Sequence, residues 1–278
     1  MLRCRHGIHL KKIIYFLALI SMEMLPRTYI DTFRKALTRD MGACLETLAK
    51  PENGGFEYLL EAGAVYSSNI EGNTMDVNSF MNAKLVRGPK PKEYDEITDL
   101  KAAYDFAREH PLTEENLLNA HAIMSRGFLS EGNMGAYRQD KVGVFSESGL
   151  VYLAAPHDQA PQEMQALFAA IEHVISEKPD ATEALYFAAL AHLQFAHIHP
   201  FADGNGRAAR LLEKWLLVAL LGERAWLVES ERYYWEHRDA YYAAINLGVN
   251  YYELDYERCV PFILLLGEAL CARTDAEK

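Results

Sequence analysis

One segment of the chain is apolar on nearly every side of a helix, and it constrains the fold more than any other feature. The segment ALYFAALAHLQFAHI covers residues 184–198 and follows Asp180-Ala-Thr-Glu183, which has the spacing of an N-terminal capping arrangement. A helix without a polar face is stable only when other elements surround it. Pro200 cannot continue the helix. The sequence therefore predicts one central, buried helix that ends beside residue 199.

The other segments predict a mostly helical chain with a single β-hairpin. Apolar residues recur at helical spacing over residues 29–48, 56–72, 75–88, 92–110, 113–128, 162–176, 211–221, 232–248 and 259–270. Residues 141–155 differ, because two short β-prone runs, Val142–Phe145 and Leu150–Leu153, flank a turn. We expect an all-α fold with one hairpin in a single large domain, which 278 residues are sufficient to form.

The overall charge and the cysteines argue against several classes of protein. A net charge of −11 leaves no basic footprint, so we expect no nucleic-acid partner. The absence of any CxxC pair argues against a zinc ribbon or a disulfide framework, and it favours free thiols in a reducing cytoplasm. The cysteines are Cys4, Cys44, Cys259 and Cys271.

Residues 1–23 form an N-terminal extension whose role stays open. Basic residues precede the apolar run IIYFLALISM, which is too short to span a bilayer. The run fits a weak export signal, a surface helix, or an upstream extension of a protein that starts at Met22 or Met24. We favour the last two, because the remainder resembles a cytoplasmic protein without a membrane segment.

The stretch HPFADGNGRAAR, residues 199–210, follows the central helix directly. Glycines at 204 and 206 allow backbone N–H groups to converge on an anion, and a helix that begins there adds its positive dipole end. Arg207 and Arg210 lie three apart and so occupy one helical face. Together these groups suit the oxygens of a di- or triphosphate.

Two further residues of this stretch indicate chemistry at the phosphates. Asp203 is a hard oxygen ligand beside an anion site, which suggests Mg²⁺. His199 titrates near neutrality and can accept a proton from an attacking hydroxyl. Alone, each feature is typical of a turn, a cap or a solvated arginine pair. Their concentration in twelve residues favours transfer of a phosphate-containing group.

The stretch also resembles the signature of Fic-domain proteins at every defining position. Looser similarity extends over residues 56–270, including GAYRQDKVGV before the hairpin and PHDQAPQEMQAL after it. The resemblance implies a Fic-type helical bundle whose hairpin, residues 142–153, is a flap. It also implies transfer of AMP from ATP to a hydroxyl side chain of an unidentified target protein, with Mg²⁺ or Mn²⁺ as cofactor.

The resemblance assigns a role to each residue of the signature. His199 would be the base, and Asp203 would hold the metal against the α- and β-phosphates. Gly204, Asn205 and Gly206 would cradle the phosphates, with Arg207 on the β-phosphate and Arg210 on the γ-phosphate. The flap would pair with the target backbone through Val142, Gly143, Val144, Leu150, Val151 and Tyr152.

A second short motif, SSNIEGN at residues 67–73, resembles the inhibitory motif of the same family. Ser67, Glu71 and Gly72 match its defining positions. A glutamate that reaches Arg210 would form a carboxylate–guanidinium pair in the place of the γ-phosphate. We expect Glu71 to hold the enzyme mostly inactive, on a helix at about residues 56–72. Without the signature, the motif would indicate only a helix end at Gly72.

Weaker signals concern the adenine pocket and two histidines. Tyr241 and Tyr242 resemble a tyrosine pair that lines this pocket in related proteins, although helix packing explains them equally well. Asn246 and Asn250 both miss the spacing expected for an asparagine nearby. His192 and His197 lack the spacing of a metal site, so we expect core or helix-end roles. Neither a Walker motif nor a dinucleotide fingerprint is present.

We therefore predict a self-inhibited protein adenylyltransferase. The predicted organisation is a helical region at 24–130 followed by a Fic core at 131–275. Three alternatives stay open: a de-adenylylating enzyme, another Fic-type phosphate-group transferase, and a non-catalytic nucleotide sensor. A homodimer is an open alternative to a monomer.

Overall fold

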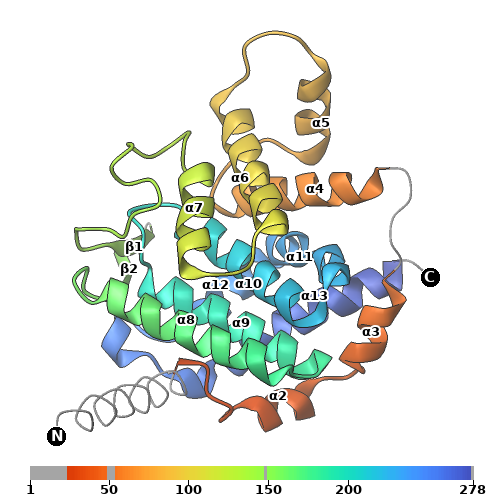
Figure 1. The fold of residues 1–278 in the computed structure, drawn as a ribbon, viewed down its shortest axis with the longest axis vertical. Helices are drawn as coiled ribbons and strands as arrows, with labels where there is room; N and C mark the ends of the chain where they lie inside the picture. Colours follow the sequence, from red (N-terminus) through yellow and green to blue (C-terminus); the bar gives the residue numbers. More distant parts are fainter. Residues whose placement is uncertain (1–23, 49–53, 147–148, 277–278) are drawn as a thin grey trace, which may run out of the picture.

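The structure is a computed structural model that describes residues 24–48, 54–146 and 149–276. It confirms an all-α architecture with one two-stranded hairpin (Figure 1). The α-helices are α2 (Ile30–Ala36), α3 (Met41–Thr47), α4 (Gly55–Ile70), α5 (Val77–Leu85), α6 (Lys92–Glu109), α7 (Glu114–Met124), α8 (Ala160–Glu177), α9 (Ala181–Ile198), α10 (Asn205–Leu221), α11 (Ser230–Glu236), α12 (Arg238–Ile245) and α13 (Val260–Ala276). The strands are β1 (Gly143–Ser146) and β2 (Gly149–Leu153), and short 3₁₀ segments lie at Glu223–Leu227, Tyr251–Glu253 and Tyr256–Arg258.

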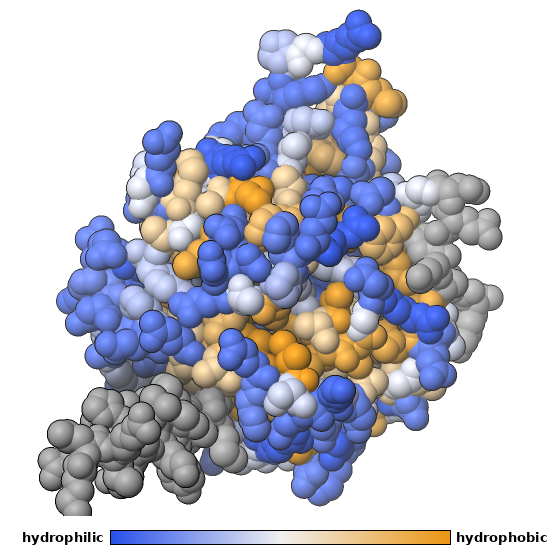
Figure 2. All heavy atoms as spheres, in the orientation of Figure 1, coloured by the Kyte–Doolittle hydropathy of each residue, from blue (hydrophilic) through white to orange (hydrophobic). Residues whose placement is uncertain are grey.

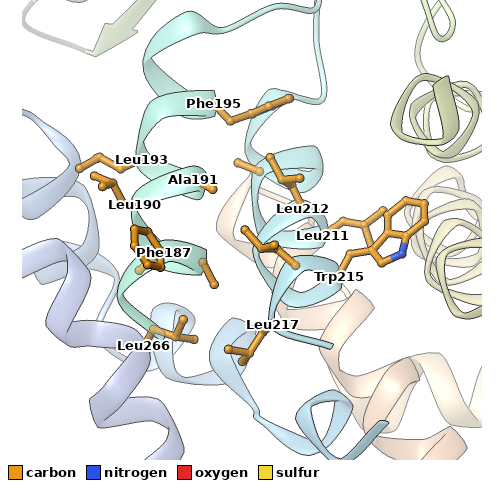
Figure 3. Packing of buried hydrophobic residues seen from close by; sticks show 14 of the residues in the cluster. Phe187, Leu190, Ala191, Leu193, Phe195, Leu211, Leu212, Trp215, Leu217 and Leu266 are labelled. Carbon is orange, nitrogen blue, oxygen red and sulfur yellow. The ribbon is translucent and has the colours of Figure 1, made fainter. Parts of the chain in front are cut away.

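The predicted central helix is α9, and it lies in the middle of the molecule. Helices α2, α3, α8, α10 and α13 all contact it, so every residue from Ala184 to Phe195 is buried. Asp180 caps its first turn by accepting a hydrogen bond from the Glu183 N–H at 2.8 Å. Figure 3 shows apolar side chains from α9 and α10 filling the space between these two helices. This core fixes the start of α10 next to the end of α9.

The helix predicted over residues 29–48 is wrong as one element. The structure ends α2 at Ala36, and Leu37 adopts an extended conformation. Asp40 then begins α3 as its N-cap, with its carboxylate accepting from the Ala43 N–H at 2.9 Å. An aspartate that bonds the backbone two or three residues ahead competes with a continuous helix.

Helix α4 crosses the bundle and contacts α6, α10 and α11. Its last turn is unusual because three of its four residues, Ser67, Ser68 and Asn69, are both buried and polar. Helix α5 and the loop that joins it to α6 project above the rest of the molecule (Figure 1). Hydrophilic residues predominate on the face drawn in Figure 2. The buried polar residues at the end of α4 differ from this pattern, and they need hydrogen-bond partners inside the protein.

The hairpin pairs β1 with β2 in antiparallel register, with an irregularity between Val144 and Phe145. The base of the hairpin, at the end away from the turn, is joined to the body of the protein. The Leu153 N–H donates to the Val249 carbonyl at 2.9 Å, and Leu153 forms a parallel bridge with Asn250. The hairpin therefore stands at the surface with its base fixed. The N-terminal extension at 1–23 lies outside the described residues.

Candidate active site

His199 follows the last residue of α9 and has a left-handed backbone, with φ of 52° and ψ of 58°. Its N–H still donates to the Phe195 carbonyl at 2.9 Å, so the residue closes the helix. Its Nδ1 lies 3.2 Å from the Ala196 carbonyl oxygen. A carbonyl only accepts, so Nδ1 carries the proton and Nε2 keeps its lone pair. Burial lowers the pKa of His199 below its ordinary value, which favours this neutral form.

Arg138 holds the His199 backbone in this conformation. Its Nε donates to the His199 carbonyl at 2.7 Å, and its Nη1 and Nη2 donate to the carbonyls of Asp140 and Ala155. The side chain is only 2% exposed. Sequence reasoning quoted this residue only as part of a segment before the flap. Three backbone carbonyls that converge on one guanidinium were not visible in the sequence, because they come from three different segments.

The loop between α9 and α10 is held from inside by Asn205. Its amide nitrogen donates to the Phe201 carbonyl at 2.9 Å, and its amide oxygen accepts from the Phe201 N–H at 2.8 Å. The side chain of Asn205 is therefore occupied within the loop. A contact between Asn205 and phosphate stays a prediction for its backbone N–H, which opens α10 without an intrahelical acceptor.

His121, on α7, supports the same loop and was missed by sequence reasoning. Its ring stacks on Phe201 at 3.6 Å between centroids, and Nδ1 accepts from the Gly135 N–H at 3.0 Å. The other nitrogen, Nε2, must then carry the proton that it shares with the Asp203 carbonyl at 3.0 Å. Burial lowers the pKa of His121 to about 4, so it is neutral at pH 7.

The N-terminus of α10 presents the two predicted arginines. Gly204, with φ of 80°, turns the chain into the helix, as the glycine pattern predicted. The Arg207 guanidinium lies 3.9 Å from the centre of the Phe128 ring, in a cation–π contact that fixes its position. Arg210, one turn later, is fully buried and points toward α4. Phe128, which holds Arg207 in place, is a further residue of the site that nothing in the sequence predicted.

Arg210 binds the polar end of α4. Its Nε donates to Ser67 Oγ at 2.9 Å, and its Nη2 donates to the Ser67 carbonyl at 2.9 Å and to Glu71 Oε1 at 2.7 Å. The spacing between Ser67 and Glu71 in the short motif is thus the spacing that lets one arginine contact both residues. Gly72 follows with φ of 97°, which ends the helix.

Glu71 also lies over the N-terminus of α10. A Cβ atom on Gly206 would overlap the Glu71 carboxylate, so this carboxylate occupies the space directly above the first turn of the helix. Burial alone would raise the pKa of Glu71, but the adjacent Arg210 charge holds that pKa below its ordinary value. The carboxylate is therefore an anion in the place where the sequence predicts phosphate oxygens.

A cavity of about 530 Å³ opens beside these groups. Its lining includes Glu71, His199, Gly206, Tyr241 and Tyr242, together with residues of the hairpin. Helix α12 carries both tyrosines, but Tyr241 is 2% exposed whereas Tyr242 is 46% exposed. Asn246 also lines the cavity, whereas Asn250 bridges to the hairpin. His192 and His197 are buried and bonded, as expected for core roles.

The flap residues divide into exposed and buried sets. Val144, Leu150 and the unpredicted Phe145 are at least 39% exposed, and Val142 and Gly143 are half-buried beside them. Tyr152 differs, because its side chain is 8% exposed and its hydroxyl donates to the His197 carbonyl at 2.6 Å. The Tyr152 side chain therefore joins the flap to the end of α9, and docking of a target through the Tyr152 backbone stays a prediction.

Comparison with known proteins agrees with this geometry. Residues 111–217 match the model of the Fic/DOC family, over a range that runs from just before α7 to α10. Residues 111–217 are therefore similar to a Fic domain. The matched range contains the complete signature, and it excludes α4 with Glu71.

Curated relatives of the Fic domain include two named "Protein adenylyltransferase Fic". The Drosophila mojavensis protein is 29% identical over 163 residues, which is 55% of this chain and 30% of that protein. The Culex quinquefasciatus protein is 29% identical over 194 residues, which is 66% of this chain and 36% of that protein. The chain thus spans about a third of the length of the curated relatives it matches.

Solved structures show the same fold. A Fic family protein from Desulfovibrio desulfuricans has a TM-score of 0.67 and 25% identity, over 93% of this chain and 74% of the other. A Fic domain containing signaling protein from Bacteroides thetaiotaomicron has a TM-score of 0.64 and 19% identity, over 89% of this chain and 94% of the other. The predicted Fic-type bundle with one hairpin is confirmed.

Asp203 is the residue that the sequence predicts as a ligand of a divalent metal. Its side chain is 61% exposed, and its Oδ1 lies 3.8 Å from Arg207 Nη2. No cluster of three or more metal-ligating side chains exists among the residues that the structure describes. Mg²⁺ is commonly held by one or two carboxylates together with substrate phosphates. A single exposed carboxylate beside the predicted phosphate site fits that pattern.

No helix within the described residues has the length and apolar character required to cross a membrane.

Proposed function

We propose that this protein transfers AMP from ATP to a hydroxyl side chain of a target protein, and that Glu71 holds it mostly inactive. The observation that carries the proposal is the convergence of His199, Asp203, Arg207 and Arg210 on the N-terminus of α10, with a carboxylate already in the anion position. The names of the relatives support the same reaction.

His199 would act as the base through Nε2. Burial favours the neutral ring, and the Nδ1–H contact with Ala196 leaves the lone pair on Nε2. His199 lines the cavity, so this lone pair can accept a proton there. The hydroxyl proton of the target moves to Nε2, while the hydroxyl oxygen forms a bond to the α-phosphorus. The bond between that phosphorus and the bridging oxygen breaks, and pyrophosphate leaves.

The remaining residues would position charge. Arg207, the first-turn N–H groups of α10 and Arg210 bind the β- and γ-phosphates, and α10 directs its positive dipole end at them. Asp203 would hold Mg²⁺ or Mn²⁺, which supplies charge neutralisation at the phosphates when bound. Tyr242 offers an exposed ring against which adenine can stack.

Glu71 would inhibit transfer by competition with phosphate. Its carboxylate lies on Arg210 and above Gly206, so a γ-phosphate cannot reach either while Glu71 stays in place. A nucleotide can still enter the cavity, but its α-phosphorus is then misaligned for attack. The same ionised carboxylate lies in the His199 cavity, which favours de-adenylylation as a second candidate, because it can orient a water.

Intact-mass analysis after incubation with ATP and Mg²⁺ tests the proposal. The three proteins are the wild type, Glu71→Gly, and Glu71→Gly with His199→Ala. We expect self-modification by AMP in the Glu71→Gly protein alone. If a purified AMP-modified target loses AMP to the wild-type protein, the de-adenylylation candidate is correct. A protein that binds ATP without releasing pyrophosphate in any variant is a nucleotide sensor.

A further inference from the structure

A chain of buried polar groups leads from Arg210 into the core, and neither the signature nor the inhibitory motif includes it. Arg210 Nη1 lies 3.4 Å from the Tyr241 hydroxyl, which lies 3.0 Å from Nε2 of His192. Nδ1 of His192 lies 2.8 Å from Glu213 Oε2. All four side chains are at most 2% exposed. We call Tyr241, His192 and Glu213 the relay.

The hydrogen bonds of the relay run in one direction when the His192 ring carries a single proton. The Glu213 carboxylate only accepts, so this proton lies on His192 Nδ1, and His192 Nε2 is then an acceptor. The Tyr241 hydroxyl then donates its single proton to Nε2. Its lone pairs remain for the Nη1–H of Arg210, which only donates. Arg210, Tyr241 and His192 thus each donate to the next group along the path toward Glu213.

The cost of burying Glu213 argues that the relay has a role beyond packing. Oε1 of Glu213 has no hydrogen-bond partner among the described residues, and an unsatisfied buried carboxylate oxygen destabilises a protein. The neighbouring cation, Lys214, is already paired with Glu231. The cation that the relay reaches is Arg210, the predicted γ-phosphate ligand.

We propose that Tyr241, His192 and Glu213 are positioning residues that orient Arg210 for the γ-phosphate. This inference rests on the proposed function. When Glu71 leaves, Arg210 loses a contact at Nη2 but keeps the Tyr241 hydroxyl at Nη1 and Ser67 at Nε and Nη2. The relay thus holds the guanidinium plane in place, so that Nη2 can bind phosphate. Tyr241 serves Arg210 rather than adenine.

Nucleotide affinity distinguishes this role from a structural one. Arg210 contacts the γ-phosphate, so its misorientation weakens ATP binding and leaves AMP binding unchanged. We compare the dissociation constants of ATP and AMP by calorimetry in Glu71→Gly and in Glu71→Gly combined with Tyr241→Phe or His192→Phe. Tyr234→Phe in the same background is the matched control. Tyr234 is fully buried, stacks on Tyr241 and donates to the same Glu213 oxygen, but lies off the path to Arg210.

We expect Tyr241→Phe and His192→Phe to raise the dissociation constant of ATP about tenfold. The dissociation constant of AMP in these variants should stay within about twofold of the Glu71→Gly parent. Both constants should stay within the same limit in the Tyr234→Phe control. If His192→Phe does not fold, Tyr241→Phe decides the result, because it removes one hydroxyl only.

The proposed role of the relay is overturned if Tyr241→Phe leaves the ratio of the ATP and AMP dissociation constants unchanged. It is also overturned if Tyr234→Phe loses as much ATP affinity as Tyr241→Phe. If the Glu71→Gly parent takes up AMP while the ratio is unchanged, the relay alone is wrong. A parent that binds no ATP overturns the proposed function and the relay together.

Discussion

Nη2 of Arg210 lies 2.7 Å from Oε1 of Glu71, although the two residues are 139 positions apart in the chain. Arg210 is fully buried, and the Glu71 side chain keeps 32% exposure because it borders the cavity. A buried arginine requires an anion nearby. In this molecule Glu71, at the end of α4, supplies the anion. We propose that a phosphate supplies it during catalysis, so that Glu71 and ATP compete for one cation.

Adding a methyl group at Gly206 tests whether the two anions share one place. A Cβ there overlaps the Glu71 carboxylate and fills the space above the first turn of α10. We expect Gly206→Ala in the Glu71→Gly background to weaken ATP binding at least about tenfold, because phosphate meets the same methyl. Gly127→Ala is the control, because its Cβ would have ordinary contacts at 3.6 Å. Equal ATP affinity in both variants would place the phosphates elsewhere.

The Tyr242 hydroxyl donates to the Ile70 carbonyl at 2.9 Å, and Ile70 is the last residue of α4. Removing this bond loosens the segment that carries Glu71. We expect Tyr242→Phe to raise basal AMP transfer about fivefold, which corresponds to one net hydrogen bond. The same substitution in the Glu71→Gly protein is the control and should add nothing. A similar rise in both backgrounds would mean that Tyr242 acts on the nucleotide rather than on Glu71.

Arg138 binds three backbone carbonyls around His199, which a lysine ammonium cannot reach together. We expect Arg138→Lys to lower the free energy of unfolding by about 2 kcal/mol. AMP transfer in the Glu71→Gly background should fall at least about tenfold, because the base loses its position. Arg126→Lys, at an exposed arginine, is the control for urea denaturation and activity. Unchanged transfer in Arg138→Lys would show that His199 keeps its geometry without this support.

Stability should fall as the pH drops from about 6.5 toward 4. Burial lowers the pKa of both His121 and His197 to about 4, so the folded protein binds fewer protons than the unfolded chain in this window. Each histidine then lowers the free energy of unfolding by about 1.4 kcal/mol for each pH unit within this window. Urea denaturation between pH 7 and pH 5 should show a smaller pH slope for His121→Phe than for the wild type. His173→Gln, at an exposed histidine, is the control. Equal slopes in all three proteins would contradict the buried neutral state of His121.

The fold class followed from the sequence because its strongest signals are local. A segment without a polar face had to be the buried helix α9, and glycine and proline marked its neighbours. The break between α2 and α3 was missed, because the apolar spacing continues across Leu37–Asp40 and only the side-chain bond of Asp40 interrupts it.

The supporting residues of the site could not be predicted from the sequence. Glu71 and Arg210 were paired in advance only because two short motifs resembled those of one family. His121, Phe128 and Arg138 reach the signature from α7 and from the segments between α7 and β1. Their contacts are with backbone carbonyls and ring faces, which leave no pattern in the sequence. The contact of the Tyr152 hydroxyl with the end of α9 also had no sequence signal, because strand alternation does not reveal such a bond.

The position of the transferred label decides whether this site transfers AMP. The Glu71→Gly protein is incubated with Mg²⁺ and ATP that is radiolabelled at either the α- or the γ-phosphate, with the wild type and Glu71→Gly/His199→Ala beside it. We expect protein-bound label from the α-phosphate only, and we expect it to require both the loss of Glu71 and the presence of His199. Label from the γ-phosphate, or equal α-label in the His199→Ala protein, would contradict adenylyl transfer by this site.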